Sequence, residues 1–219
     1  MTEAMGRKTP EEICALAPLI PVITVEKIEQ AAPLAKALYA GGLRALEVTL
    51  RTDCALEAIK AMRAAVPEAS VGAGTLRDAR DVMACLEAGV DFGVSPGSPA
   101  GLMEAVAAAK MPFLPGCASP TEAMTLADKG FKVVKFFPAE AAGGVPMLKS
   151  MAAPLPDIKV CPTGGVSIQN APDYLKLPNV AVVGGSWICP MDAVRGGDWD
   201  KIERLCAFAV EALAPYQQG

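Results

Sequence analysis

A lysine stands in the middle of an apolar run of this 219-residue chain, where Val134 precedes Lys135 and Phe136 follows it. Burial removes part of the water that stabilises a protonated amine, and a neutral amine in a dry pocket is a nucleophile toward carbonyl carbon. Lys135 is therefore the first candidate for covalent chemistry. The alternative is a lysine that reaches the surface from the end of a strand, with its stem on apolar neighbours.

A carboxylate and a guanidinium come from a second apolar run, at 45–50 and just after it. Because side chains alternate across a strand, Glu47 and Arg51 lie on one face, and Lys135 lies on the corresponding face of the run 132–137. An amine that attacks a ketone, a carboxylate that moves protons and an arginine that holds a carboxylate suit an imine-forming enzyme of keto acids. The alternative is a structural ion pair of Glu47 with Lys135 or Arg51.

Paired glycines follow the last two predicted strands. The pairs are Gly164-Gly165, after the run 159–163, and Gly184-Gly185, after the run 180–183. A residue without a Cβ lets backbone N–H groups approach an anion closely. A tight turn explains one pair, but two pairs after consecutive strands favour a phosphate site. From this pattern we expect a phosphate to be held by Gly164, Gly165, Gly185 and Ser186.

Eight short strand-like runs alternate with helical stretches rich in Ala, Leu and Met. The runs lie at 19–24, 45–50, 70–74, 92–95, 113–116, 132–137, 159–163 and 180–183. Helical stretches are expected at 28–39, 56–66, 79–88, 102–110 and 202–213. We expect one α/β domain over residues 1–219, a (β/α)8 (TIM) barrel with an extra N-terminal helix near 10–17 on its floor. Such barrels take about 200–250 residues and often bind phosphate after strands seven and eight. An open, doubly wound sheet is the alternative.

The composition excludes several function classes. The chain has no histidine, which removes the commonest general base and metal ligand. Its seven scattered cysteines include no C-x-x-C pair and fit a reducing cytoplasm. A net charge of −4 without a basic stripe argues against nucleic acid. Residues 1–10 lack the apolar centre of a signal peptide, and the longest uncharged stretch, 177–191, falls short of the roughly 20 residues of a membrane helix. We expect a cytoplasmic enzyme without metal or cofactor.

Five segments carry a further signal. They are Glu47-Val48-Thr49-Leu50-Arg51-Thr52, Gly72-Ala73-Gly74-Thr75, Lys135-Phe136-Phe137-Pro138-Ala139-Glu140, Pro162-Thr163-Gly164-Gly165 and Gly184-Gly185-Ser186-Trp187. At these segments the chain resembles the family of 2-keto-3-deoxy-6-phosphogluconate (KDPG) and 4-hydroxy-2-oxoglutarate aldolases.

The resemblance implies a class I aldolase of the Entner–Doudoroff pathway that forms a homotrimer. Its substrate would be KDPG, cleaved to pyruvate and D-glyceraldehyde 3-phosphate, and also 4-hydroxy-2-oxoglutarate, cleaved to pyruvate and glyoxylate. Lys135 would form the Schiff base and Glu47 would be the acid and base. The resemblance places the keto acid at Arg51, Thr75, Pro96 and Phe137. It places the phosphate and hydroxyl groups at Thr163, Gly164, Gly165, Gly184, Gly185 and Ser186. Thr163 resembles the gluconate rather than the galactonate branch.

Other functions share part of this pattern. An isomerase or decarboxylase with a phosphate-binding barrel has the same glycine-rich rim but needs no inward lysine. A galactonate-specific aldolase would differ in its stereochemistry at the fourth carbon. A non-catalytic sensor of phosphorylated metabolites gains little from a desolvated nucleophile.

Overall fold

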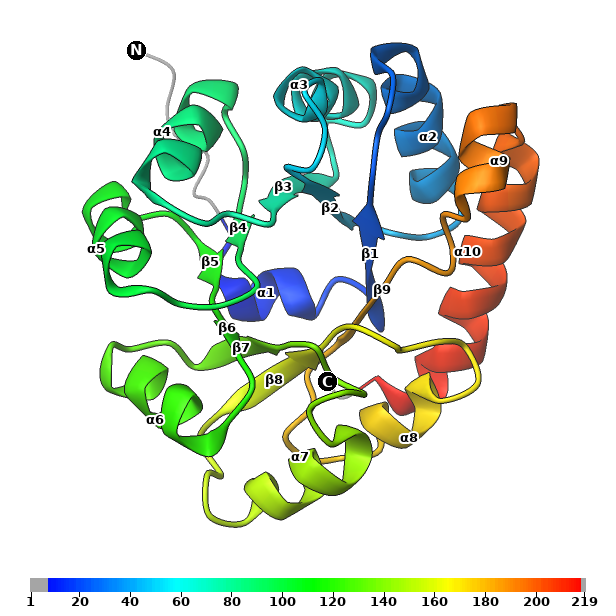
Figure 1. The fold of residues 1–219 in the computed structure, drawn as a ribbon. Coiled ribbons are helices and arrows are strands. Elements are labelled where there is room, and N and C mark those ends of the chain that lie inside the picture. Colours follow the sequence, from blue (N-terminus) through cyan, green and yellow to red (C-terminus); the bar gives the residue numbers. More distant parts are fainter. Residues whose placement is uncertain (1–7, 218–219) are drawn as a thin grey trace.

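Parallel strands and helices alternate along the chain and close into a barrel with the helices outside (Figure 1). The computed structural model describes residues 8–217. The strands are β1 (Leu19–Ile23), β2 (Ala45–Thr49), β3 (Ser70–Gly74), β4 (Gly93–Val94), β5 (Phe113–Leu114), β6 (Gly116–Cys117), β7 (Val133–Phe136), β8 (Lys159–Pro162) and β9 (Val183–Gly185).

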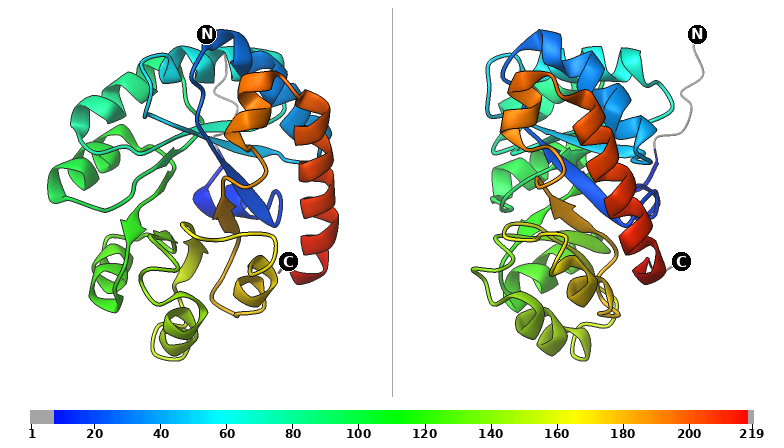
Figure 2. Two further views of the ribbon diagram at one scale, coloured as in Figure 1. Left: turned by 45° about the vertical axis from the view of Figure 1, so that its right-hand side comes forward. Right: turned by 90° about the vertical axis from the view of Figure 1, so that its right-hand side faces the viewer.

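Helices follow most strands and cover the outside of the barrel, apart from α1, which lies across its floor. They are α1 (Pro10–Cys14), α2 (Ile28–Ala40), α3 (Ala55–Ala65), α4 (Ala79–Ala88), α5 (Ala100–Ala109), α6 (Pro120–Asp128), α7 (Gly144–Ala152), α8 (Ala171–Leu175), α9 (Met191–Gly196), α10 (Trp199–Leu213) and the 3-10 turn η1 (Ala214–Tyr216). The long α10 runs beside α2, as Figures 1 and 2 show. Within residues 8–217, no helix combines the length and apolarity that crossing a membrane requires.

Pairing between strands closes the barrel. One sheet has the order β5-β4-β3-β2-β1-β9 and a second has the order β6-β7-β8, with every pair parallel. Single bridges, Thr163 with Gly184 and Val160 with Val180, join the end of the second sheet to the first. At the other seam, β5 and β6 are two halves of one barrel position, divided at Pro115, which has no N–H to donate. The (β/α)8 barrel is confirmed, and the open sheet is wrong.

Side-chain alternation sorts the strands into an inner and an outer face, as the sequence predicts. Leu46 and Val48 of β2, and Val134 of β7, lie in the core between strands and helices. Glu47 and Lys135 come from the alternate positions and are buried inside the barrel. Apolar side chains fill the remainder of the interior: Ile13, Cys14, Ile20, Ala45, Phe92, Val94, Leu114, Val133, Cys161 and Val182.

The extra N-terminal helix closes the floor of the barrel, as predicted, and Figure 1 shows α1 across the barrel's centre. A capping box begins it: Thr9 N donates to Glu12 Oε2 over 2.7 Å, and Glu12 N donates to Thr9 Oγ1 over 3.2 Å. Ile13 and Cys14 then pack into the interior core. The floor is therefore closed, and the opposite rim, at the carboxyl ends of the strands, remains for a ligand.

The prediction for the last strand needs correction. We predicted a strand at 180–183 followed by a glycine turn, but β9 covers Val183–Gly185, and Val180 makes only an isolated bridge. Gly184 and Gly185 pair with Ile20 and Pro21 of β1 and so belong to the strand. Glycine has low strand propensity, which is why the pair resembles a turn in the sequence. Two further predicted strands need smaller corrections. β4 covers Gly93–Val94 rather than 92–95, and the predicted strand at 113–116 is divided into β5 and β6.

Candidate active site

Lys135 and Glu47 meet inside the barrel. The Nζ atom of Lys135 lies 3.1 Å from Oε1 of Glu47, and the two residues are 5% and 4% exposed. Lys135 is on β7 and Glu47 is on β2, so the closure of the barrel brings together residues 88 positions apart. The lysine does not reach bulk solvent, and the expectation of a buried amine beside a carboxylate holds.

A cavity of about 140 Å³ opens above Lys135 at the carboxyl rim. Phe137 flanks it, with the Lys135 Nζ atom 5.6 Å from the centre of the Phe137 ring. The residues lining the cavity are Val22, Arg51, Lys135, Phe137, Thr163, Gly164, Gly165, Val166, Gly184, Gly185 and Ser186. A neighbouring cavity of about 260 Å³ shares Val22, Arg51 and Ser186 with the first. A ligand can therefore touch the amine, the arginine and both glycine-rich segments together.

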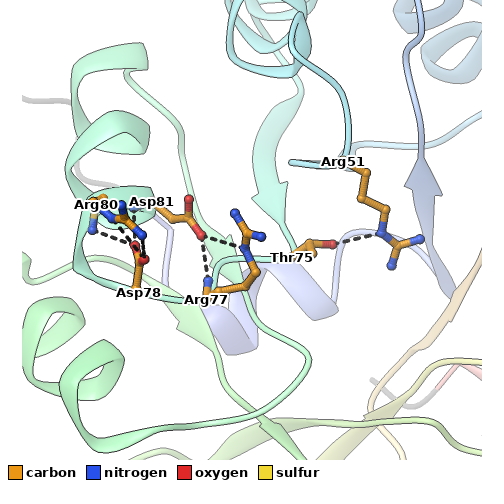
Figure 3. Close-up of polar contacts among 6 residues, drawn as sticks. All are labelled: Arg51, Thr75, Arg77, Asp78, Arg80 and Asp81. Carbon is orange, nitrogen blue, oxygen red and sulfur yellow. Dashed lines mark hydrogen bonds and ion pairs between the residues drawn. The ribbon is translucent and has the colours of Figure 1, made fainter.

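Arg51 extends over the rim toward Thr75 of the neighbouring β3–α4 connection (Figure 3). Its Nε atom donates a 3.2 Å hydrogen bond to Thr75 Oγ1, and its two terminal nitrogens donate to no residue within 8–217. Thr75 has φ 69°, in the left-handed region that a β-branched residue rarely adopts. The threonine thus orients a guanidinium whose free edge matches a carboxylate.

Backbone N–H groups converge on the same cavity from two segments. Gly164, Gly165, Val166 and Ser186 line the cavity, and their amides donate no hydrogen bond to any residue between 8 and 217. Gly164 and Gly165 have φ 99° and 81°, which glycine adopts without strain. Unsatisfied amides beside a cavity form an anion site of the kind that holds phosphate.

The glycines of β9 lie where a side chain has no room. Thr163 Oγ1 occupies the space of a Cβ at Gly184, and the Trp187 ring occupies that of a Cβ at Gly185. This close packing keeps the rim segments of β8 and β9 side by side. Thr163 itself lines the cavity.

The structure brings together most of the residues that the sequence predicts for the site. Nine of them line the cavity directly, Glu47 contacts Lys135, and Thr75 contacts Arg51. Pro96 is exposed and does not line this cavity. Sequence reasoning missed Val22 and Val166; alternation along 19–24 would have turned Val22 inward, whereas nothing local marks Val166.

A larger cavity, about 580 Å³, lies near the start of β3 at the opposite end of the barrel. Three of its charged side chains are in ion pairs: Arg63 with Asp91 at 3.0 Å, and Lys60 with Glu57 at 2.7 Å. Its two lysines, Lys8 and Lys60, are both exposed, so the buried amine that the chemistry requires lies at the smaller cavity. Within residues 8–217 there is no group of three or more Cys, Asp or Glu that could hold a metal ion.

Known proteins resemble this chain in sequence and in fold. A family model described as KDPG and KHG aldolase matches residues 11–205. The chain is 47% identical over 205 residues to the KHG/KDPG aldolase of Escherichia coli (strain K12), across 94% of this chain and 96% of that protein.

Two solved structures are similar along nearly their whole length. The KDPG aldolase of Legionella pneumophila, with pyruvate captured at low pH as a covalent carbinolamine intermediate, superposes with a TM-score of 0.91 at 42% identity, covering 94% of this chain and 100% of that one. The KDPG aldolase of Zymomonas mobilis ZM4 with 3-phosphoglycerate gives a TM-score of 0.87 at 46% identity, covering 94% and 96%.

Proposed function

The chain belongs to the family of KDPG and KHG aldolases, and on that premise we propose that it cleaves KDPG to pyruvate and D-glyceraldehyde 3-phosphate. It is a class I aldehyde-lyase of the Entner–Doudoroff pathway that works through a lysine Schiff base. It also cleaves 4-hydroxy-2-oxoglutarate to pyruvate and glyoxylate. The observation that carries the proposal is the 3.1 Å contact between Lys135 Nζ and Glu47 Oε1, buried beneath a cavity that two glycine-rich segments share.

Covalent chemistry begins at Lys135. After its proton passes to Glu47, Nζ attacks the C2 ketone. Glu47 returns the proton to the hydroxyl of the resulting carbinolamine, which leaves as water and gives a protonated imine. Glu47, directly or through a water molecule, removes the proton of the C4 hydroxyl. The C3–C4 electrons move toward the imine nitrogen, the bond breaks, and D-glyceraldehyde 3-phosphate leaves. The enamine takes a proton at C3, and water hydrolyses the imine to pyruvate and the free amine.

The rim residues bind the two charged ends of the substrate. We assign the carboxylate to the free edge of Arg51, which Thr75 orients, with Phe137 against the keto acid. Pro96 completes this part of the site in our proposal, on the strength of the resemblance alone. The phosphate is assigned to the free amides around the glycine pairs, with the Thr163 hydroxyl beside the substrate's hydroxyl groups. These residues are Thr163, Gly164, Gly165, Gly184, Gly185 and Ser186.

Assembly and location form a further part of the proposal. We propose a homotrimer, each subunit a single catalytic domain over residues 1–219, in the cytoplasm. Large apolar side chains on the outer helices support contacts between subunits: Ile28, Met83, Met124 and Phe208 are 42–60% exposed. All seven cysteines are free, which fits a reducing compartment. Light scattering on the purified protein measures the mass, and a monomer or dimer would contradict the trimer.

Pyruvate release tests the function. The protein is incubated with KDPG, with its C4 epimer and with 4-hydroxy-2-oxoglutarate, and lactate dehydrogenase reports the pyruvate formed. We expect turnover of KDPG and 4-hydroxy-2-oxoglutarate, with KDPG preferred over its epimer. Preference for the epimer would indicate the galactonate-specific aldolase. Turnover that persists in Lys135→Arg would indicate an isomerase- or decarboxylase-type mechanism without an imine.

A further inference from the structure

We propose that Glu140 and Tyr174 act as a positioning pair that holds the Gly164-Gly165 turn in the shape that binds phosphate. The inference rests on the phosphate role assigned to that turn above. Neither side chain lines the cavity, so the pair acts through the turn and not on the substrate.

Backbone hydrogen bonds first bring the segment after β7 against the turn. Ala139 N donates to Thr163 O over 2.8 Å, and Glu140 N donates to Gly164 O over 3.0 Å. These two bonds continue the pairing of β7 with β8 beyond the ends of both strands. The residue that follows Lys135 by five positions is thereby fixed beside the phosphate glycines.

The Glu140 side chain then covers Gly165. A Cβ at Gly165 would lie 2.5 Å from Cγ and 2.7 Å from Cβ of Glu140, so the carboxylate's stem fills the space that glycine leaves. The position of the turn depends on this stem, because nothing else occupies that side of Gly165 within 3.5 Å of such an atom.

Tyr174 of α8 fixes the position of the Glu140 carboxylate. Its side chain is fully buried, and its hydroxyl donates a hydrogen bond to Glu140 Oε1. Burial, together with this hydrogen bond and the negative charge of Glu140, raises the pKa of the Tyr174 phenol. The phenol therefore remains a protonated donor at neutral pH. Gly144 leaves room for the contact between Tyr174 and Glu140, since a Cβ at Gly144 would lie 3.2 Å from Tyr174 Oη and 3.3 Å from Glu140 Oε1.

The contacts have a consequence for anion binding. Both carbonyls of the turn are occupied: Gly164 O accepts from Glu140 N, and Gly165 O accepts from Asn170 Nδ2 over 3.1 Å. The amides are left for the anion. A carboxylate so close to a phosphate would repel it, and the Tyr174 proton offsets part of that charge. Losing the hydroxyl should loosen the turn and strengthen the repulsion together.

The test compares one substrate with and without its phosphate. We measure kcat and KM for KDPG and for 2-keto-3-deoxygluconate in wild type, Tyr174→Phe and Glu140→Gln. We also measure inhibition by inorganic phosphate. Matched controls are Tyr39→Phe, whose ring packs under Arg44, and Glu57→Gln, whose carboxylate pairs with exposed Lys60. Thermal melting of every variant reports whether it folds.

In Tyr174→Phe we expect the KM for KDPG to be about tenfold higher than in wild type, which corresponds to about 1.4 kcal/mol. Inhibition by inorganic phosphate should weaken in parallel. KM for the unphosphorylated substrate and kcat for both should stay within twofold of wild type, as in the controls. An equal change for both substrates, or no change in either variant, overturns the positioning role. A wild type that does not favour the phosphorylated substrate overturns the phosphate site itself, and with it this inference.

Discussion

Glu47 occupies the space that a Cβ at Gly74 would need, because Gly74 ends the neighbouring strand on the same inner face. A Cβ there would lie 2.8 Å from both Cγ and Cδ of Glu47 and closer still to Oε1. The absence of a side chain at this position lets the carboxylate reach Lys135 across the barrel.

Gly74→Ala should therefore displace the acid and not the lysine. We expect kcat to fall about 100-fold, the cost of moving a catalytic group by roughly 1 Å, with a smaller effect on KM. Gly101→Ala is the matched control, because nothing lies within 4 Å of a Cβ at this helical position. Wild-type kcat in Gly74→Ala would show that the position of Glu47 does not limit turnover.

Glu47→Gln keeps the shape of the side chain but removes its ability to take a proton. We expect kcat to fall by about 10²- to 10⁴-fold, the usual contribution of a general base, while the imine with pyruvate still forms. Pre-steady-state trapping with borohydride separates the two steps. Glu104→Gln on the exposed side of α5 should behave as wild type. If the Gln variant fails to form the imine, the carboxylate acts earlier than proposed.

Arg51→Lys replaces a planar guanidinium, which can bind a carboxylate through two hydrogen bonds, by a compact ammonium group. We expect KM for both keto acids to rise at least about tenfold, because a bidentate contact with the carboxylate is lost. Arg77→Lys provides the control: its guanidinium pairs with Asp81 on the same rim but away from the cavity (Figure 3). Equal changes in KM for Arg51→Lys and Arg77→Lys would contradict the assignment of the substrate carboxylate to Arg51.

The cysteines should differ sharply in reactivity. Burial raises the pKa of Cys161, at the base of the site, to about 12. At pH 8 such a thiol is ionised to roughly one part in 10,000, and the thiolate is the reactive form. Burial also raises the pKa of Cys14, Cys85, Cys117, Cys189 and Cys206.

Cys54 is more accessible than the other six cysteines, because it is only half-buried, in the connection before α3. Titration with a chromogenic disulfide at pH 8 should find one fast thiol in the native protein and seven after unfolding. Cys54→Ser should abolish the fast phase. Several fast thiols would contradict the buried positions of the other six.

Much of the site could be predicted because alternation along a strand is a local property. The faces of Glu47 and Lys135 follow from their neighbours in the chain, and the glycine pairs mark the rim whether they lie in a turn or in a strand. Closure of the barrel then brings the two strands together, as the number and spacing of the elements indicate.

Other features depend on register and on distant contacts, which the chain does not display locally. A side chain has no room at Gly74 because Glu47, on the adjacent strand, occupies that space. Gly184 and Gly185 belong to a strand because β1 pairs with them. The contact of Glu140 with Tyr174 joins positions 34 residues apart, each of which resembles an ordinary surface or core residue in the sequence.

Reduction of the protein by borohydride in the presence of pyruvate tests the central claim most directly. Peptide mapping by mass spectrometry should find one reduced pyruvyl group per chain, on Lys135, and none in Lys135→Ala, which should also lose nearly all turnover. A pyruvyl group on another lysine, or an unmodified protein that still cleaves KDPG, would contradict the account.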